Sequence, residues 1–251
     1  STASLSIIND THEVPETLKG ATSLLAANPS DLLFWNGDIF NDVRSDDQIV
    51  SQILRPADAP YAAGTPLCFV SGNHDVRGIH ARSLDSFIDT PESRRFYTLR
   101  HGPIAIVVLD TGEDKPDTHE VYAGLGEFAR YRDTQRLWLE HAIQSEAFRS
   151  APFRLAILHI PLFGKAASDD SRNKWLDLLA AARIDASISG HVHEYLYTST
   201  GESRPFAQLV GGGPKPEAAT VIRAQADDRR MALLVQDLSG KELGNFEFKR
   251  T

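Results

Sequence analysis

The chain has 251 residues, of which 41% are apolar and 24% are charged. This composition is typical of one large globular domain with a well-formed core, or of at most two small ones, and it excludes a disordered or fibrous chain. The formal net charge of −8 disfavours nucleic acid as a partner, because such binding depends on Lys and Arg contacts with phosphates. No apolar run is long enough to span a bilayer, and the single cysteine, Cys68, excludes an internal disulfide.

Strands and helices are expected to alternate along most of the chain. The hydrophobic pattern predicts, in chain order, a strand at 5–10, a helix at 14–28, a strand at 31–38, a helix at 46–55 that Pro56 and Pro60 stop, a strand at 66–70, two strands within 94–110, a polar loop at 112–126, a helix at 130–146, a strand at 153–161, a helix at 171–183 and a strand at 184–195. An all-β tail with a hairpin at Ser239 and Gly240 follows. The pattern predicts one α/β domain over residues 1–251, with its site beyond the carboxyl ends of the strands.

Five predicted strands end in polar side chains of the same kind. The segments are DTH at 10–12, GD at 37–38, GNHD at 72–75, His159, and GHVH at 190–193. Each alone has an ordinary explanation, such as a helix cap, a turn or a hydrogen-bonded core histidine. In GHVH, the period-two alternation of an extended segment would place both imidazoles on one face. Five such strand ends in one chain favour a metal site.

The donor types fit a site for two ions. Carboxylate, amide and imidazole donors suit Mn, Fe or Zn, and no cysteine is available for a thiolate site. The number of candidate ligands is too large for one ion with an open position, but it suits two ions that share a bridging ligand. Such a pair lowers the pKa of water and holds both oxygens of an in-line displacement at phosphorus.

In this order, the five segments resemble the calcineurin-like metallophosphoesterase superfamily, in a branch between purple acid phosphatases and class III phosphodiesterases. The resemblance runs from Asp10 to His193, which is most of the chain. It implies a four-layered αββα sandwich with two mixed β-sheets, in which we expect the strand-rich tail to form the second sheet.

The resemblance also implies a role for each residue of the five segments. Asp10, His12 and His193 would hold one metal, Asn73, His159 and His191 the other, and Asp38 would bridge both. The ions would be two divalent or trivalent transition metals (Mn, Fe, Zn or a mixture). His74 would lie near the leaving oxygen as an acid or charge stabiliser, and Asp75 would support the catalytic groups by orienting its neighbours.

Two departures from the family patterns narrow the branch. Purple acid phosphatases carry a tyrosine ligand three residues after the bridging aspartate, where this chain has Asn41, so no purple Fe–tyrosinate site is expected. GNHD in place of GNHE disfavours a protein phosphatase.

Relatives often carry an N-terminal β-sandwich domain, which would explain why the chain enters its first strand at once. An exported (periplasmic or extracellular) protein and a cytoplasmic one both remain open.

The substrate pocket is less clear from the sequence. Arg77 and Arg44 are candidates for phosphate contacts, with exposed ion pairs as the alternative. Phe163 and Lys165 are candidates for lining the cleft, although their segment could be only a loop. The loop at 112–126, with His119 and Tyr122, is long enough for a lid. The glycines at 211–213, followed by Pro214, could approach the site, but a turn between strands is the preferred interpretation.

The sequence therefore predicts a binuclear metal-dependent phosphoric ester hydrolase acting on a small phosphodiester or phosphomonoester, such as a nucleotide. The alternative is a metal-binding scaffold without turnover whose cleft serves a protein partner. A DNA nuclease is a third option, which the negative charge disfavours.

Overall fold

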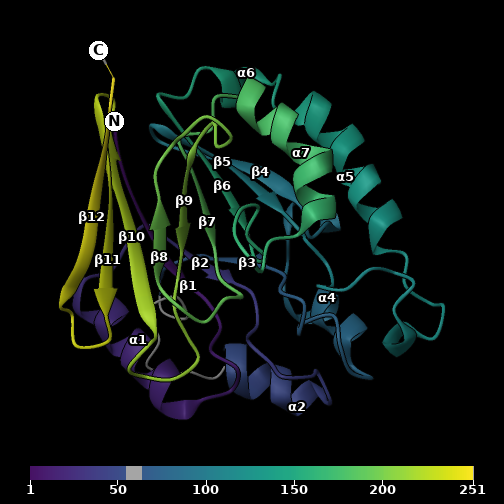
Figure 1. Cartoon of the computed structure of the whole chain (residues 1–251). Coiled ribbons are helices and arrows are strands. Elements are labelled where there is room, and N and C mark those ends of the chain that lie inside the picture. Colours follow the sequence, from purple (N-terminus) through teal and green to yellow (C-terminus); the bar gives the residue numbers. More distant parts are fainter. Residues whose placement is uncertain (55–63, 251) are drawn as a thin grey trace.

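The computed structural model describes residues 1–54 and 64–250 and contains two six-stranded β-sheets packed face to face between helices (Figure 1). The first sheet has the strand order β12-β11-β10-β1-β2-β3, and the second has the order β4-β5-β6-β7-β9-β8. Both sheets are mixed, with parallel strands beside antiparallel ones. Among the described residues, no helix combines the length and apolar character that a bilayer span requires.

The first sheet joins the two ends of the sequence. Its strands are β1 (Thr2–Ile8), β2 (Leu32–Asn36), β3 (Leu67–Val70), β10 (Thr220–Asp227), β11 (Arg230–Asp237) and β12 (Glu242–Lys249). The strands β1, β2 and β3 are parallel, whereas β10 pairs antiparallel with β1 in a register that sets Ile7 opposite Ile222. The carboxyl ends of β1, β2 and β3 therefore lie at one edge of this sheet.

The second sheet comes from the middle of the chain. Its strands are β4 (Tyr97–His101), β5 (Ile104–Leu109), β6 (Phe153–Leu158), β7 (Ala186–Ser189), β8 (Leu196–Thr198) and β9 (Ala207–Val210). The strands β5, β6, β7 and β9 are parallel. The alternation of buried side chains explains the layering, since one face of each inner strand packs on the other sheet and the opposite face packs on helices, whereas β8, β11 and β12 leave their outer faces partly exposed.

Helices cover both outer faces. They are α1 (Pro15–Ala27), α2 (Asp46–Ile49), α4 (Leu84–Phe87), α5 (Phe128–Ala142), α6 (Glu146–Arg149) and α7 (Asp169–Ala181), with a π-helical turn at Val50–Leu54 and 3₁₀ turns at Ala81–Ser83, Pro91–Ser93 and Glu120–Tyr122. Three apolar clusters fill the three gaps between layers: one between the sheets, one between the first sheet and α1 with α2, and one between the second sheet and α5 with α7. The expected four-layered αββα sandwich is confirmed.

The expectation that the strand-rich tail forms the second sheet is wrong. The strands β10, β11 and β12 extend the first sheet beside β1, and only β8 and β9 of the tail join the second sheet. Hydrophobic alternation predicts that a segment is a strand, but it does not identify the strand with which it pairs. The predicted helix at 46–55 is observed as α2 and the π-helical turn, while Arg55, Pro56 and Pro60 lie outside the described residues.

Candidate metal centre

The five polar segments meet where the carboxyl ends of β1, β2 and β3 face those of β6 and β7. Two groups of side chains have ligand atoms within 4.8 Å of one another. The first group contains Asp10, His12, Asp38 and His193, and the second contains Asp38, His159 and His191. Asp38 belongs to both groups, so the sheets bring together two adjacent sets of metal-compatible donors that share one carboxylate.

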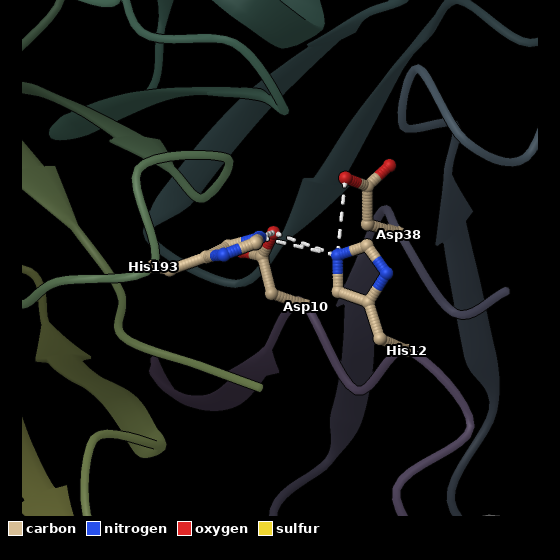
Figure 2. Close-up of side chains that lie close together, drawn as sticks. All are labelled: Asp10, His12, Asp38 and His193. Carbon is tan, nitrogen blue, oxygen red and sulfur yellow. Dashed lines mark hydrogen bonds and ion pairs between the residues drawn. The ribbon is translucent and has the colours of Figure 1, made fainter. Parts of the chain in front are cut away.

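In the first group, the donor atoms point toward a common position (Figure 2). The Nε2 atoms of His12 and His193 are 3.1 Å apart. His12 Nε2 lies 3.5 Å from Asp38 Oδ2, and His193 Nε2 lies 3.3 Å from Asp10 Oδ1. Two imidazole nitrogens directed at each other and at two carboxylates form a donor set that suits a transition-metal ion.

The second group lies on the other side of Asp38. His159 Nε2 is 3.1 Å from Asp38 Oδ2 and 3.8 Å from Asp10 Oδ1. Asn73 is buried, and its Oδ1 lies 3.0 Å from His191 Nδ1, so the amide expected to be a ligand lies beside this group. The structure thus brings all seven candidate ligands to one place.

Two buried atoms of the centre fit a metal because they have no other hydrogen-bond partner. Asp38 Oδ2 and His159 Nε2 are buried, and neither has a hydrogen bond of acceptable geometry among the described residues. His159 Nδ1 donates to the main-chain oxygen of Asn36 (2.8 Å), so that in a neutral ring Nε2 would be the unprotonated nitrogen that a metal could bind. An imidazole oriented by a main-chain carbonyl in this way is typical of metal ligands.

The electrostatics of the centre favour positive charge. Burial lowers the pKa of the His159 imidazole, but the Asp38 and Asp10 carboxylates outweigh burial and raise it to about 10. Burial opposes ionisation of Asp38, yet His159 and His12 hold the pKa of that carboxyl well below its usual range. Burial and the neighbouring His159 lower the pKa of His191 to about 4. Carboxylates that attract a proton to a fully buried imidazole would equally attract a metal cation.

Five of the candidate ligands have left-handed backbone conformations, and they are Asp10 (φ 48°), His12 (43°), Asp38 (52°), His191 (70°) and His193 (63°). Such conformations are uncommon outside glycine and collect at functional sites. The expectation that GHVH is extended, with both imidazoles on one face, is wrong, because His191 and His193 have left-handed backbone conformations. The left-handed turns direct His191 to one group of donors and His193 to the other.

Two glycines allow the site loops to approach each other. A Cβ atom at Gly72 would collide with the Asp38 carboxylate, and one at Gly190 would collide with the Asp10 carboxylate. Positions 72 and 190 therefore have to be glycine, because the Asp38 and Asp10 carboxylates occupy the space that a side chain would need.

Asp75 stabilises the loops that carry Asp38 and Gly72 by accepting hydrogen bonds from their main-chain N–H groups. It is fully buried, and its Oδ2 accepts hydrogen bonds from the main-chain N–H groups of Asp38 (2.9 Å) and Gly72 (2.8 Å). Its Oδ1 accepts from the N–H groups of Ile39 (3.0 Å) and Phe40 (3.3 Å). Both oxygens are therefore engaged by the backbone, which supports the expected role of Asp75 in positioning its neighbours.

We expect Asp75→Asn to destabilise the loop that carries Asp38. The amide nitrogen would face N–H donors, and each buried donor left without an acceptor costs about 1–3 kcal/mol. The free energy of unfolding should fall by several kcal/mol in urea titrations of the metal-free protein, and metal affinity should fall by about 10–100-fold. The matched control is Asp89→Asn at an exposed position. Unchanged stability and metal affinity would contradict this role.

His74 lies beside the first group without belonging to it. Its ring centroid is 4.9 Å from that of His12, and its main-chain N–H donates to Asp38 Oδ1 (2.9 Å). Its Nδ1 donates to the main-chain oxygen of Asn41 (2.7 Å), which directs Nε2 away from that carbonyl. The side-chain oxygen of Asn41 also lies 3.2 Å from His12 Nδ1. The sequence marked Asn41 only as a missing tyrosine, whereas the structure shows that it orients two histidines.

Arg77 connects His74 to the long loop at 112–126. Its guanidinium pairs with Glu113 at 2.8 and 2.6 Å, and its Nη1 lies 3.1 Å from His74 Nε2. The buried Arg132 holds this loop by donating to the main-chain oxygens of Thr111 (2.8 Å) and Glu113 (2.6 Å). Glu113 carried no sequence signal, because a lone glutamate in a polar loop is ordinary.

The other pocket candidates lie in simpler surroundings. Arg44 is an exposed ion pair with Asp42 (3.0 Å). Phe163 packs against Phe206 within the cluster beneath α7, and Lys165 is exposed. In the loop, His119 Nδ1 accepts from the N–H of Val121 (3.2 Å), and its ring lies 6.2 Å from that of Tyr122.

The buried glycines at 211–213 are more than a turn between strands. Gly211 packs against Asn9 and Gly213 against Asp10. Asn9 donates to Asp10 Oδ2 (2.6 Å), a contact that the sequence did not indicate.

Comparison with known proteins agrees with this geometry. The model of the calcineurin-like phosphoesterase family matches residues 4–195. No curated protein sequence matches the chain. Among solved structures, a purple acid phosphatase from yellow lupin (Lupinus luteus) seeds is similar with a TM-score of 0.74 and 17% identity, covering 100% of this chain and 54% of that one. This chain thus spans about half the length of the lupin protein.

Two further structures share the fold. GAP50, described as the anchor in the inner membrane complex of Plasmodium, has a TM-score of 0.70 and 14% identity, covering 100% of this chain and 89% of that one. TT1561 of Thermus thermophilus has a TM-score of 0.56 and 10% identity, covering 99% of each chain. At these identities, the structural likenesses show the fold alone, whereas the family model covers most of the chain. The chain therefore belongs to the calcineurin-like phosphoesterase family.

Proposed function

We propose that the protein is a binuclear metal-dependent hydrolase of small phosphodiesters or phosphomonoesters. The observation that carries this proposal is the position of Asp38, whose carboxylate belongs to both groups of donors. Asp10, His12 and His193 would complete one site, and Asn73, His159 and His191 the other. The O and N donors suit Mn, Fe, Zn or a mixed pair. The substrate would be a small phosphoester such as a nucleotide.

When bound, the ions would supply Lewis-acid activation of water and neutralisation of charge at phosphorus. The chain's own residues would do the rest. Asn41 holds His74 by its Nδ1, and a proton on Nε2 could pass to the departing alkoxide once Arg77 Nη1, 3.1 Å from Nε2, has turned to the substrate. Arg77, held by Glu113 beside His74, would contribute positive charge where the phosphoryl oxygens develop negative charge.

Elemental analysis combined with hydrolysis on the same preparation tests the proposal. We expect about two transition-metal ions per chain, hydrolysis of bis-p-nitrophenyl phosphate or p-nitrophenyl phosphate, loss of activity on chelation and recovery on adding Mn²⁺ or Zn²⁺. The ratio of diester to monoester turnover would define the substrate class.

A protein scaffold without turnover is the competing function, since GAP50, which has a similar fold, is described as an anchor. The complete donor set and the oriented His74 favour catalysis in this chain. Two metals per chain without hydrolysis of either ester, and of a panel of nucleotide phosphoesters, would support the scaffold instead.

A further inference from the structure

A second polar cavity lies at the opposite end of the second sheet from the metal centre. It has a volume of about 450 Å³ and lies where α5 and α7 end and α6 and β6 meet. Ile143, Phe148 and Ala182 form part of its wall, and Arg149, Arg154 and Arg183 supply its charge. Because β6 begins at Phe153 and reaches the metal centre after Leu158, the strand separates the two by roughly 17 Å at 3.3 Å per residue.

The cavity has a concentrated positive charge in a chain whose net charge is −8. No carboxylate lines it, and in the part of the chain that the structure describes none of its three guanidinium groups forms an ion pair. Arg154 is half-buried and donates through Nε to the main-chain oxygen of Phe148 (3.2 Å) and through Nη2 to that of Arg149. Arg149 and Arg183 are exposed at the rim.

Neighbouring negative charges do not cancel the positive charge of the three guanidinium groups. The carboxyl ends of α5 and α7 each contribute roughly half a negative charge, which is small against three full positive charges. Asp185 is nearby, but it is already paired with Arg250 (2.6 Å). Burial, and to a smaller extent the neighbouring Arg250 and Arg183, lower the pKa of the Arg154 guanidinium, and the Asp185 carboxylate opposes this shift without reversing it.

We propose that this cavity binds a small anion with two or more adjacent phosphate groups. Guanidinium groups bind phosphate oxygens in a bidentate manner, and several of them around one cavity match several phosphate groups better than one. The cavity volume lies in the range of small-molecule sites. This inference does not depend on the proposed hydrolase function, because the cavity contains none of the residues of the metal centre.

Titration with pyrophosphate, followed by ¹H–¹⁵N correlation spectra, tests the proposal at residue resolution. The amides of Gln144 and Ala182 report on the cavity, and those of Gly72 and Gly190 report on the metal centre, which also attracts phosphates. We expect saturable shifts at the cavity amides. In the double variant Arg149→Gln/Arg183→Gln, the affinity measured there should fall by about tenfold or more, because two charged partners are lost.

Arg130→Gln is the matched control, since Arg130 is exposed on the first turn of α5, at the far end of that helix from the cavity. It should leave the cavity shifts unchanged, and an unchanged melting temperature of the double variant would show that its fold is intact. Orthophosphate should bind more weakly than pyrophosphate. Shifts confined to the metal-centre amides, or cavity shifts that persist unchanged in the double variant, would overturn the proposal.

Discussion

Replacing Asp38 by Asn is expected to abolish hydrolysis and to lower the metal content at both sites together. Asp38 Oδ2 lies 3.5 Å from His12 Nε2 and 3.1 Å from His159 Nε2, so one carboxylate oxygen serves both groups of donors. An amide has nearly the same shape, and its oxygen can still accept from the His74 main-chain N–H. The change therefore removes charge and leaves the loop in place. Turnover should fall by about 10³-fold or more, because both water activation and charge neutralisation depend on the ions.

Metal analysis and turnover of the nitrophenyl esters would measure this effect. Asp89→Asn, at an exposed position, is the control for the loss of one carboxylate. Circular dichroism should show that both variants are folded. If Asp38→Asn retained two ions and full turnover, Asp38 would not be the shared ligand, and if it lost only one ion, Asp38 would serve a single site.

His74→Asn should separate catalysis from metal binding. The His74 ring belongs to neither group of donors, and its contact with Asp38 is made by the main-chain N–H, which the substitution retains. The variant should therefore keep both ions. Its turnover should fall by about 10²–10⁴-fold if the imidazole acts as a general acid.

The leaving group distinguishes an acid from a simple source of charge. Protonation matters most for a poor leaving group, so the loss caused by His74→Asn should be larger for an alkyl phosphoester than for the nitrophenyl ester. An equal loss for both substrates would indicate charge stabilisation instead. His141→Asn, at an exposed position in the last turn of α5, is the control. Loss of metal from the His74 variant would contradict its assignment outside the ligand set.

The sequence predicted most of the centre because its donors are grouped at strand ends. Asp10, Asp38 and His159 each follow a buried strand, and parallel strands in adjacent positions bring their carboxyl ends together. Asn41 and Glu113 could not be predicted in this way. They act through single contacts with residues distant in the sequence, and a lone amide or carboxylate in a loop carries no pattern.

Two further predictions from the sequence failed because they applied a rule for local backbone structure to features that depend on the surrounding fold. Period-two alternation placed His191 and His193 on one face, but this rule holds only for extended backbone, and both residues are left-handed. Alternation correctly identified the strands of the tail, but their pairing with β1 depends on packing between distant segments. The choice of pairing partner is not encoded in either segment alone.

The central place of β1 in the first sheet has a consequence for the order of folding. Ile7 pairs with Ile222, so one edge of β1, the strand that leads to Asp10, stays unpaired until more than 200 further residues have been synthesised. Contacts between such distant residues form slowly, and an unpaired strand edge is prone to aggregation in the meantime. The donors of the metal centre likewise come from segments between Asp10 and His193. The full set of donors therefore exists only after His193 has been synthesised, so any ion held at this centre would be acquired after that point.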